Sequence, residues 1–262
     1  MLKRFWDKVI PLIKNISHLH IGVYAAYACF FLVLAVFPLL VLLLSLVRYA
    51  GLQINTLTDM LRGYLPQALM DSARRLILST YRATSGALVG VSAITALWSA
   101  SRGIHGLLTG LNAIYGVRED RGYLYTRSVS VLYTFAFLIV LLLTLMLHVF
   151  SNTLLQMLSI SDVPFLRFLL LLGAQTALFC AMFTVLPNRK NRFFDSLPGG
   201  LLASAGWLIF SDLYSIYVEH FSNYANIYGS VYAVALSMLW LYFCVSIVFY
   251  GGALNAWLSR NP

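Results

Sequence analysis

Long apolar runs dominate this sequence and limit the folds open to it. A helix needs about 20 mostly apolar residues to cross a bilayer. The chain is 60% hydrophobic and 10% charged, whereas soluble domains are about 45–50% apolar and about 25% charged. A soluble core of this size cannot hide that much apolar surface. We therefore predict an all-α, polytopic membrane protein that forms a single membrane domain over residues 1–262. Six spans are expected, at about 22–47, 86–111, 128–150, 164–186, 197–218 and 229–258, the second continuing as helix to Tyr115.

Two segments outside the spans have patterns of their own. Residues 1–20 mix aromatic and aliphatic side chains with basic ones, as an interfacial helix does. Between 56 and 84, Pro66 separates two stretches with apolar residues at helical spacing. We expect this external amphipathic segment to rest on the bundle or on lipid headgroups, or alternatively to dock an envelope partner.

The distribution of basic residues predicts the orientation of the spans. With the amino terminus inside, the cytoplasmic segments contain eleven of the 18 Lys and Arg residues. The external loops 151–163 and 219–228 contain none. Basic residues are retained on the cytoplasmic side, so both termini are predicted to be cytoplasmic. The same rule explains the net charge of +9 without nucleic acid as a partner.

Polar and charged residues within or near the spans are the candidate functional residues, because embedded charges are costly and usually serve a function. The candidates for a cavity or pathway are Arg102, Asp212, Arg167, Glu219, His148, Asn112 and Asn255. Helical rise places Arg102 near the cytoplasmic boundary and Asp212 in the external half of its span. An ion pair between these two is therefore not expected.

The candidates instead suggest two polar vestibules separated by an apolar neck. The outer vestibule would contain Arg48, His148, Arg167, Asp212, Glu219 and His220, and the inner one Arg102, His105, Asn112 and Asn255. Alternatively, Arg102 and Arg167 extend to the interfaces, Glu219 and His220 are solvated, and His148 is a packing residue.

No pattern for catalysis, a metal or a cofactor is present in the sequence. The three cysteines lie separately in apolar runs, and the five histidines fall in separate segments, without the clustered ligands that a metal site needs. Ser101 has no general base at a recognisable spacing. We expect a protein that is not an enzyme and binds no cofactor or metal.

Small residues spaced four apart predict close helix contacts. The pairs are Gly86/Gly90, Gly106/Gly110, Gly199/Ala203 and Gly252/Ala256. As an alternative, the glycines at 103, 106 and 110 would mark a broken helix around a binding site.

Several motifs resemble the YihY/virulence factor BrkB family of bacterial inner-membrane proteins. They are Phe37-Pro38-Leu39, the stretches 98–104 and 110–117, Leu197-Pro198-Gly199, and the stretches 223–230, 239–242 and 251–256. The resemblance implies six helices in the inner membrane, with a proposed part in transport or envelope lipids. It also implies that a ribonuclease name once given to members is mistaken. Family members often have a glutamate before the final Leu-Asn-Ala, where this chain has Ala253, which puts proton coupling at that position in doubt.

From these patterns we predict non-enzymatic transport, or translocation or handling of envelope lipid, through a polar cavity inside the bundle. Membrane lipids are the expected partners. The alternative is a structural protein that recruits an envelope partner through residues 56–84. The sequence leaves open the transported species, any coupling ion and the oligomeric state.

Overall fold

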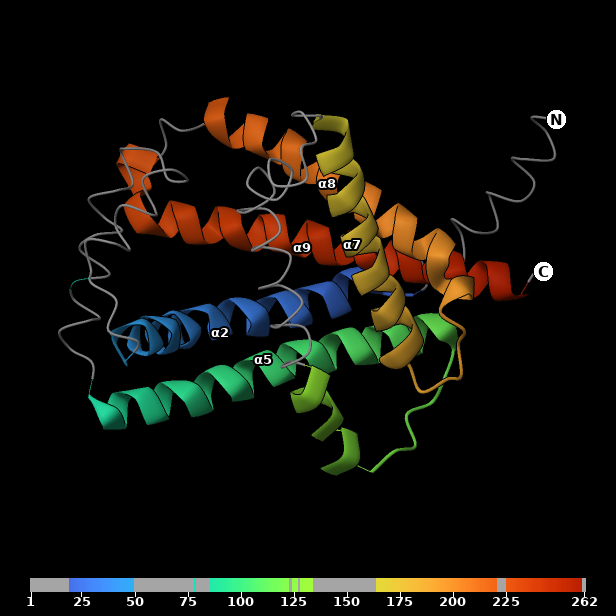
Figure 1. The fold of residues 1–262 in the computed structure, drawn as a ribbon, viewed down its shortest axis with the longest axis horizontal. Helices are drawn as coiled ribbons and strands as arrows, with labels where there is room; N and C mark the ends of the chain where they lie inside the picture. Colours follow the sequence, from blue (N-terminus) through green and yellow to red (C-terminus); the bar gives the residue numbers. More distant parts are fainter. Residues whose placement is uncertain are drawn as a thin grey trace. The chain divides into compact units, whose positions relative to one another are not determined.

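The computed structural model describes residues 19–49, 78, 85–122, 124–126, 128–133, 164–220 and 225–260. Regular structure in these ranges is entirely helical. The elements are α2 (Ile21–Tyr49), α5 (Gly86–Tyr115), α7 (Pro164–Val185), the 3-10 helix η1 (Phe194–Ser196), α8 (Leu197–His220) and α9 (Ala225–Arg260), as Figure 1 shows. The predicted all-α class is confirmed for this part of the chain.

In the described residues, four helical stretches are long and apolar enough to cross a membrane. They are Ile21–Leu42, Gly86–Tyr115, Phe194–Val218 and Val234–Arg260, and they correspond to four of the predicted spans. The predicted span 164–186 is helical as α7, with a shorter apolar part at Leu172–Val185.

The remaining sequence-based elements lie largely outside the described residues. The predicted span 128–150 is helical at 128–133, and the rest of it is not described. The same holds for nearly all of the interfacial segment 1–20 and the external segment 56–84. Six spans and both amphipathic segments therefore stay predictions.

The chain divides into two compact units, and each contains part of α2 and part of α5. The first unit consists of Met1–Phe30 and Ser101–Pro262, and the second of Phe31–Ala100. In the second unit, the rings of Phe31 and Trp98 meet edge to face with their centroids 5.9 Å apart. This contact joins the α2 and α5 portions of that unit. The single-domain organisation stays a prediction.

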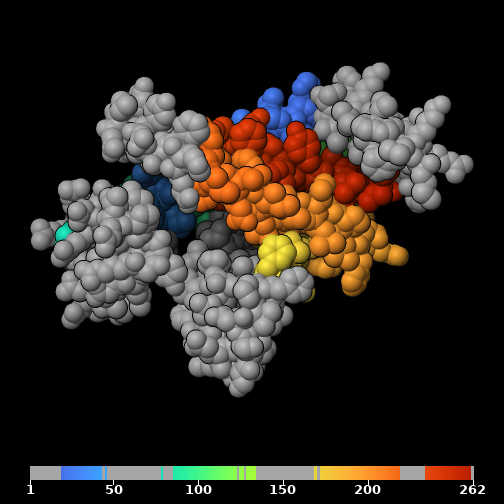
Figure 2. Space-filling view, turned by 90° about the horizontal axis from the view of Figure 1, so that it is seen from above, coloured from blue at the N-terminus to red at the C-terminus, as the bar shows by residue number. Residues whose placement is uncertain are grey.

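The first unit has an apolar core to which each of the five long helices in the described residues contributes. Its most deeply buried large side chains include Leu108, Leu111, Phe183 and Phe249. Helix α8 packs along α9, and α7 packs on α8. In the space-filling view of Figure 2, the orange surface of α8 adjoins the red surface of α9.

Small residues allow these helices to approach closely, as predicted for three of the four pairs. A Cβ added at Gly199 would collide with the Gly251 carbonyl oxygen, and one added at Gly110 would collide with the Phe249 ring. An added Cβ at Gly106 would likewise press on Tyr27. At Gly252 it would meet Leu111 at 2.9 Å. For the fourth pair, Gly86 and Gly90, an added Cβ meets no atom within 4 Å. No close helix contact among the described residues therefore explains why glycine occupies these two positions.

Helix α5 runs without a break from Gly86 to Tyr115. The alternative of a broken helix at its glycines is therefore wrong. Packing against α2 explains the glycine at 106, since Ala28 of α2 lies only 3.1 Å from where its Cβ would be.

One face of α8 presents large apolar side chains outward. Ile209, Leu213 and Ile216 are 60%, 61% and 53% exposed, and their spacing places them on one stripe of the helix. A stripe of this kind is costly in water and suits contact with lipid chains.

Candidate functional site

The turn at the end of α5 sets the direction of segment 116–122, which carries part of the candidate site. Gly116 has φ +67°, a left-handed conformation that glycine adopts with little strain. The N–H of Val117 donates to the Asn112 carbonyl at 2.8 Å, and the N–H of Gly116 to the Ala113 carbonyl at 3.1 Å. These two bonds form a Schellman motif, which satisfies the last carbonyls of the helix. The segment 116–122 therefore leaves α5 in a defined direction.

The side chain of Asn112 joins this segment to the chain that follows α7. Asn112 is 4% exposed. Its Nδ2 donates to Glu119 Oε2 at 2.7 Å, and its Oδ1 accepts the Asn188 N–H at 2.8 Å. Because buried amides need partners, the two bonds fix segments 116–122 and 186–191 against the last turn of α5.

Glu119, which accepts the hydrogen bond from Asn112, also forms a salt bridge with Arg121. Arg121 Nε lies 2.6 Å from Glu119 Oε1, and Arg121 Nη2 lies 2.6 Å from Oε2. Hydrogen bonds from Arg121, and secondarily from Asn112, hold the pKa of the Glu119 carboxyl below its ordinary value, although burial opposes them. The same pairing raises the pKa of Arg121. The carboxylate therefore stays ionised under ordinary conditions.

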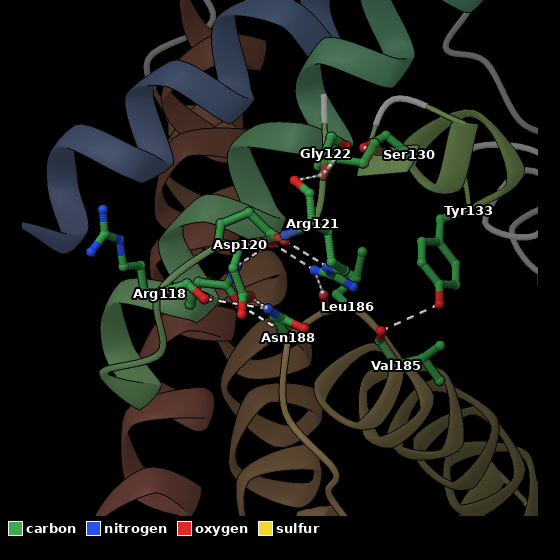
Figure 3. Close-up of polar contacts among 12 residues, drawn as sticks. Arg118, Asp120, Arg121, Gly122, Ser130, Tyr133, Val185, Leu186 and Asn188 are labelled. Atoms are coloured by element: carbon green, nitrogen blue, oxygen red, sulfur yellow. Dashed lines mark hydrogen bonds and ion pairs between the residues drawn. The ribbon is translucent and has the colours of Figure 1, made fainter. Parts of the chain in front are cut away.

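Asn188 and Arg121 make further hydrogen bonds between the segment after α5 and the segment after α7, as Figure 3 shows. Asn188 Nδ2 donates to the Arg118 carbonyl at 3.3 Å and also to the Asp120 carboxylate. Arg121 Nη2 reaches the Leu186 carbonyl at 3.4 Å. We call Asn112, Glu119, Arg121 and Asn188 the loop network. Its bonds connect two loops that are far apart in sequence.

Asn255 on α9 binds the beginning of α8. Its Oδ1 accepts the Gly199 N–H at 2.7 Å, and its Nδ2 donates to the Ser196 carbonyl at 3.1 Å. The first N–H groups of a helix have no partner within the helix, and the Asn255 side chain supplies one from a neighbouring helix.

A pocket of about 520 Å³ lies beside Asn255, between the end of α5, the chain before α8 and the end of α9. Its charged and polar lining includes Tyr115, Arg189, Lys190, Arg192, Asp195 and Asn255. We call it the basic pocket, since it combines three cationic side chains with one carboxylate. Such a pocket favours an anionic ligand.

Tyr115 and Arg189 are in contact in the wall of the basic pocket. The Arg189 guanidinium lies over the Tyr115 ring, 5.3 Å from its centroid, in the geometry of a cation–π contact. The Tyr115 hydroxyl is buried beside the Asn255 amide, and no group among the described residues reaches hydrogen-bond geometry with it. The wall thus contains a cation positioned on an aromatic ring.

Arg102 lies apart from the loop network, within the candidate span of α5. Its Nη1 donates to the Tyr27 hydroxyl on α2 at 3.5 Å. Asp212 on α8 is exposed. The side chains of Arg167 and Glu219 and the whole of His148 lie outside the described residues.

The structure does not bring the predicted inner-vestibule residues together in one site. Asn255 lines the basic pocket, Asn112 belongs to the loop network, and Arg102 contacts Tyr27. Sequence reasoning missed Tyr115, Glu119 and Asn188, and used the basic residues of the two loops only for orientation. Charged residues cluster at 118–121 and 189–192, and this clustering is the signal that could have indicated the region.

Among the residues the structure describes, no three or more His, Cys, Asp or Glu side chains gather where they would hold a metal ion. Independence from metals and cofactors stays a prediction.

Comparison with known proteins gives the family. The family described as "Virulence factor BrkB" matches residues 12–262. A protein named as ribonuclease-like, YfkH of Bacillus subtilis (strain 168), is 29% identical over 90% of each chain. The UPF0761 membrane protein VV0203 of Vibrio vulnificus (strain YJ016) is 25% identical over 95% of this chain and 82% of its own. A UPF0761 membrane protein of Chromohalobacter salexigens is 36% identical over 38% of this chain. No solved structure matches. The match along nearly the whole sequence shows that this chain belongs to the virulence factor BrkB family of membrane proteins.

Proposed function

We propose that this chain is a non-enzymatic protein of the bacterial inner membrane that translocates or handles envelope phospholipid along a polar path within its bundle. Both termini would be cytoplasmic. The observation that supports this most directly is Arg102, a cation within a membrane-crossing helix that is hydrogen-bonded to Tyr27 of a neighbouring helix.

The environment of Arg102 supports a functional role. It is the only Lys, Arg, Asp or Glu residue in α5, and a charge at such a position is expensive unless it serves a pathway or a ligand. The Tyr27 hydroxyl accepts one bond from the guanidinium. A passing phosphate would offer the guanidinium a stronger, charge-assisted contact in place of this neutral one.

Asp212 would belong to the same path from the opposite side of the membrane. It is exposed on α8 and lies on the same side of the helix as the apolar stripe of Ile209, Leu213 and Ile216. A headgroup would therefore meet Asp212 at the membrane-facing entrance of the path and not inside the bundle. Arg167, Glu219 and His148 remain proposed members of the outer vestibule.

Purified protein in liposomes tests this proposal. Fluorescent phospholipid is distributed over both leaflets, and a membrane-impermeant quencher reports how fast the inner-leaflet lipid becomes accessible. Wild type should accelerate this exchange above empty liposomes, and Arg102→Ala should reduce the acceleration by about tenfold, since one lost charged contact is worth about 1.4 kcal/mol or more. Asp212→Ala tests the outer end of the path.

Arg118→Gln is the matched control, because it removes an exposed cation that lies outside the spans. It should leave exchange unchanged. Wild-type exchange no faster than in empty liposomes, or full activity in Arg102→Ala, would overturn the lipid proposal. Solute uptake without lipid exchange would favour transport of a solute instead. Digestion of RNA by the same preparation would contradict a non-enzymatic role.

The alternative of docking through residues 56–84 concerns a segment nearly all of which lies outside the described residues. No contact among the described residues favours it.

A further inference from the structure

We infer that the basic pocket binds the phosphate-bearing, anionic headgroup of a phospholipid. The inference rests on the proposed function and deepens it, because it names the chemical class of the ligand and the residues that would hold it.

The charges of the pocket select an anion. Arg189, Lys190 and Arg192 line it together with one carboxylate, Asp195. Arg192 and Lys190 are exposed, and Arg189 is half-buried. Arginine binds phosphate through two parallel N–H bonds, and lysine binds it as a point charge. An excess of two positive charges therefore matches a phosphate group.

Tyr115 supplies an observation independent of charge. The residue is 6% exposed, and its hydroxyl is buried without a hydrogen-bond partner among the described residues. A buried hydroxyl left unpaired costs about 1–3 kcal/mol, and buried polar groups normally have partners. Less than 1 Å² of the hydroxyl oxygen is accessible, so a phosphate oxygen in the pocket would accept its hydrogen bond only after the side chains around it shift.

The start of α8 adds a favourable electrostatic contribution. Ser196 and Pro198, at the amino end of this 24-residue helix, line the same pocket. The amino terminus of a helix carries partial positive charge and attracts anions. The Asn255–Gly199 bond holds this terminus in place.

Apolar residues beside the pocket favour a lipid over free phosphate. Phe194 lines the pocket and is 77% exposed, and its neighbour Phe193 is 40% exposed. Helices α8 and α9, which border the pocket, are both candidate spans. Exposed Phe rings next to cations suit a membrane interface, because apolar side chains can insert below the headgroups while the cations stay among them, and basic pockets between spanning helices bind anionic headgroups.

The test measures lipid binding directly, without transport. Full-length protein in detergent is titrated with phosphatidylglycerol, and the lipid retained is counted by native mass spectrometry. Phosphatidylcholine with the same chains and inorganic phosphate are separate arms. We expect phosphatidylglycerol to be retained in preference to phosphatidylcholine, and inorganic phosphate to compete only at far higher concentration.

Substitutions in and near the pocket distinguish the loss of a binding charge from damage to the fold. Each of Arg189→Gln, Lys190→Gln and Arg192→Gln should weaken phosphatidylglycerol binding about fivefold, and Tyr115→Phe should weaken it severalfold. Asp195→Asn should strengthen it, a gain that damage to the fold would not produce. Arg118→Gln, a cation at the same end of the unit and outside the pocket, should have no effect.

The outcomes distinguish this inference from the proposed function. Selective binding without lipid exchange in liposomes would sustain the headgroup site and remove the translocation role. Equal retention of both lipids, or no change in the three glutamine variants, would overturn the headgroup site even if exchange occurs. Inorganic phosphate competing as strongly as the lipid would show an anion site without lipid specificity and would overturn the lipid assignment.

Discussion

Asn255 on α9 accepts the backbone N–H of Gly199 at 2.7 Å and thereby caps the first turn of α8 from a different helix. Its amide nitrogen donates to the Ser196 carbonyl one turn earlier, at 3.1 Å. Asn255 is 4% exposed, so water cannot easily replace either bond. One side chain therefore joins two helices, both of them candidate spans, and forms part of the basic pocket.

Replacing Asn255 with leucine should destabilise the protein by about 1–3 kcal/mol, since similar volume remains while a buried N–H and a carbonyl lose their partner. Thermal unfolding in detergent measures the loss. Ser246→Ala is the control on the same helix, because within the described part of the chain its hydroxyl bonds only to the Tyr242 carbonyl of its own helix. It should change stability by less than about 0.5 kcal/mol. Equal stability of the leucine variant and wild type would contradict the cap.

The contact between α8 and α9 should not tolerate a methyl group at Gly199. A Cβ there would collide with the Gly251 carbonyl oxygen and with Asn255, and backbone atoms cannot move aside as a flexible side chain can. Gly199→Ala should cost about 1–3 kcal/mol. In Gly173→Ala, where a Cβ meets nothing within 4 Å, the better helix propensity of alanine should give neutral or raised stability. The difference between the two unfolding temperatures is the measurement.

The sequence predicted α2, α5, α7, α8 and α9 within a few residues, because length and hydropathy alone determine where a chain can cross a bilayer. It also predicted close contacts at Gly110 and Gly199, since small residues spaced four apart indicate where backbones meet. The ends of helices were less accurate. Helix α9 begins at Ala225 rather than near 229, because polar residues can continue a helix beyond the apolar run.

The loop network could not be predicted from the sequence. Asn112 and Asn188 are 76 residues apart, and nothing in their spacing indicates that the two loops meet. Arg102 and Tyr27, 75 residues apart, pose the same problem. Such polar contacts depend on how helices pair, whereas hydropathy reports only where each helix lies along the chain.

Stability should fall at acidic pH through Glu119. Its carboxylate accepts four N–H donors, three from Arg121 and one from Asn112, and these lower its pKa below the ordinary value of 4.5. A group with a lowered folded-state pKa contributes fully above its unfolded pKa, and the contribution is lost as the pH falls through the folded pKa. The unfolding temperature, measured from pH 7 to pH 3, should therefore drop below about pH 4.5.

Glu119→Gln isolates this contribution from other carboxylates. The stability difference between wild type and the variant should be constant near neutral pH and shrink in the acidic range. Arg121→Gln removes the main cause of the lowered pKa, so the folded and unfolded pKa values of Glu119 should approach each other and the Glu119-dependent decline should shrink or vanish. A difference independent of pH would refute the assigned ion pair.

The turn after α5 should require glycine at position 116. Its φ of +67° costs a residue with a Cβ about 1–2 kcal/mol, and an added Cβ would lie 3.2 Å from Arg260 Nη2. Gly116→Ala should therefore lower the unfolding temperature, and Gly116→Asn should lower it less, because asparagine tolerates this conformation better. Gly122→Ala, in the same segment and with open space around the new Cβ, should be neutral or slightly stabilising.

Because the Schellman bonds also direct the chain toward Glu119, Gly116→Ala should reduce the acid-dependent part of stability as well. A variant with a lower unfolding temperature but the wild-type pH dependence would show that the turn and the loop network are independent.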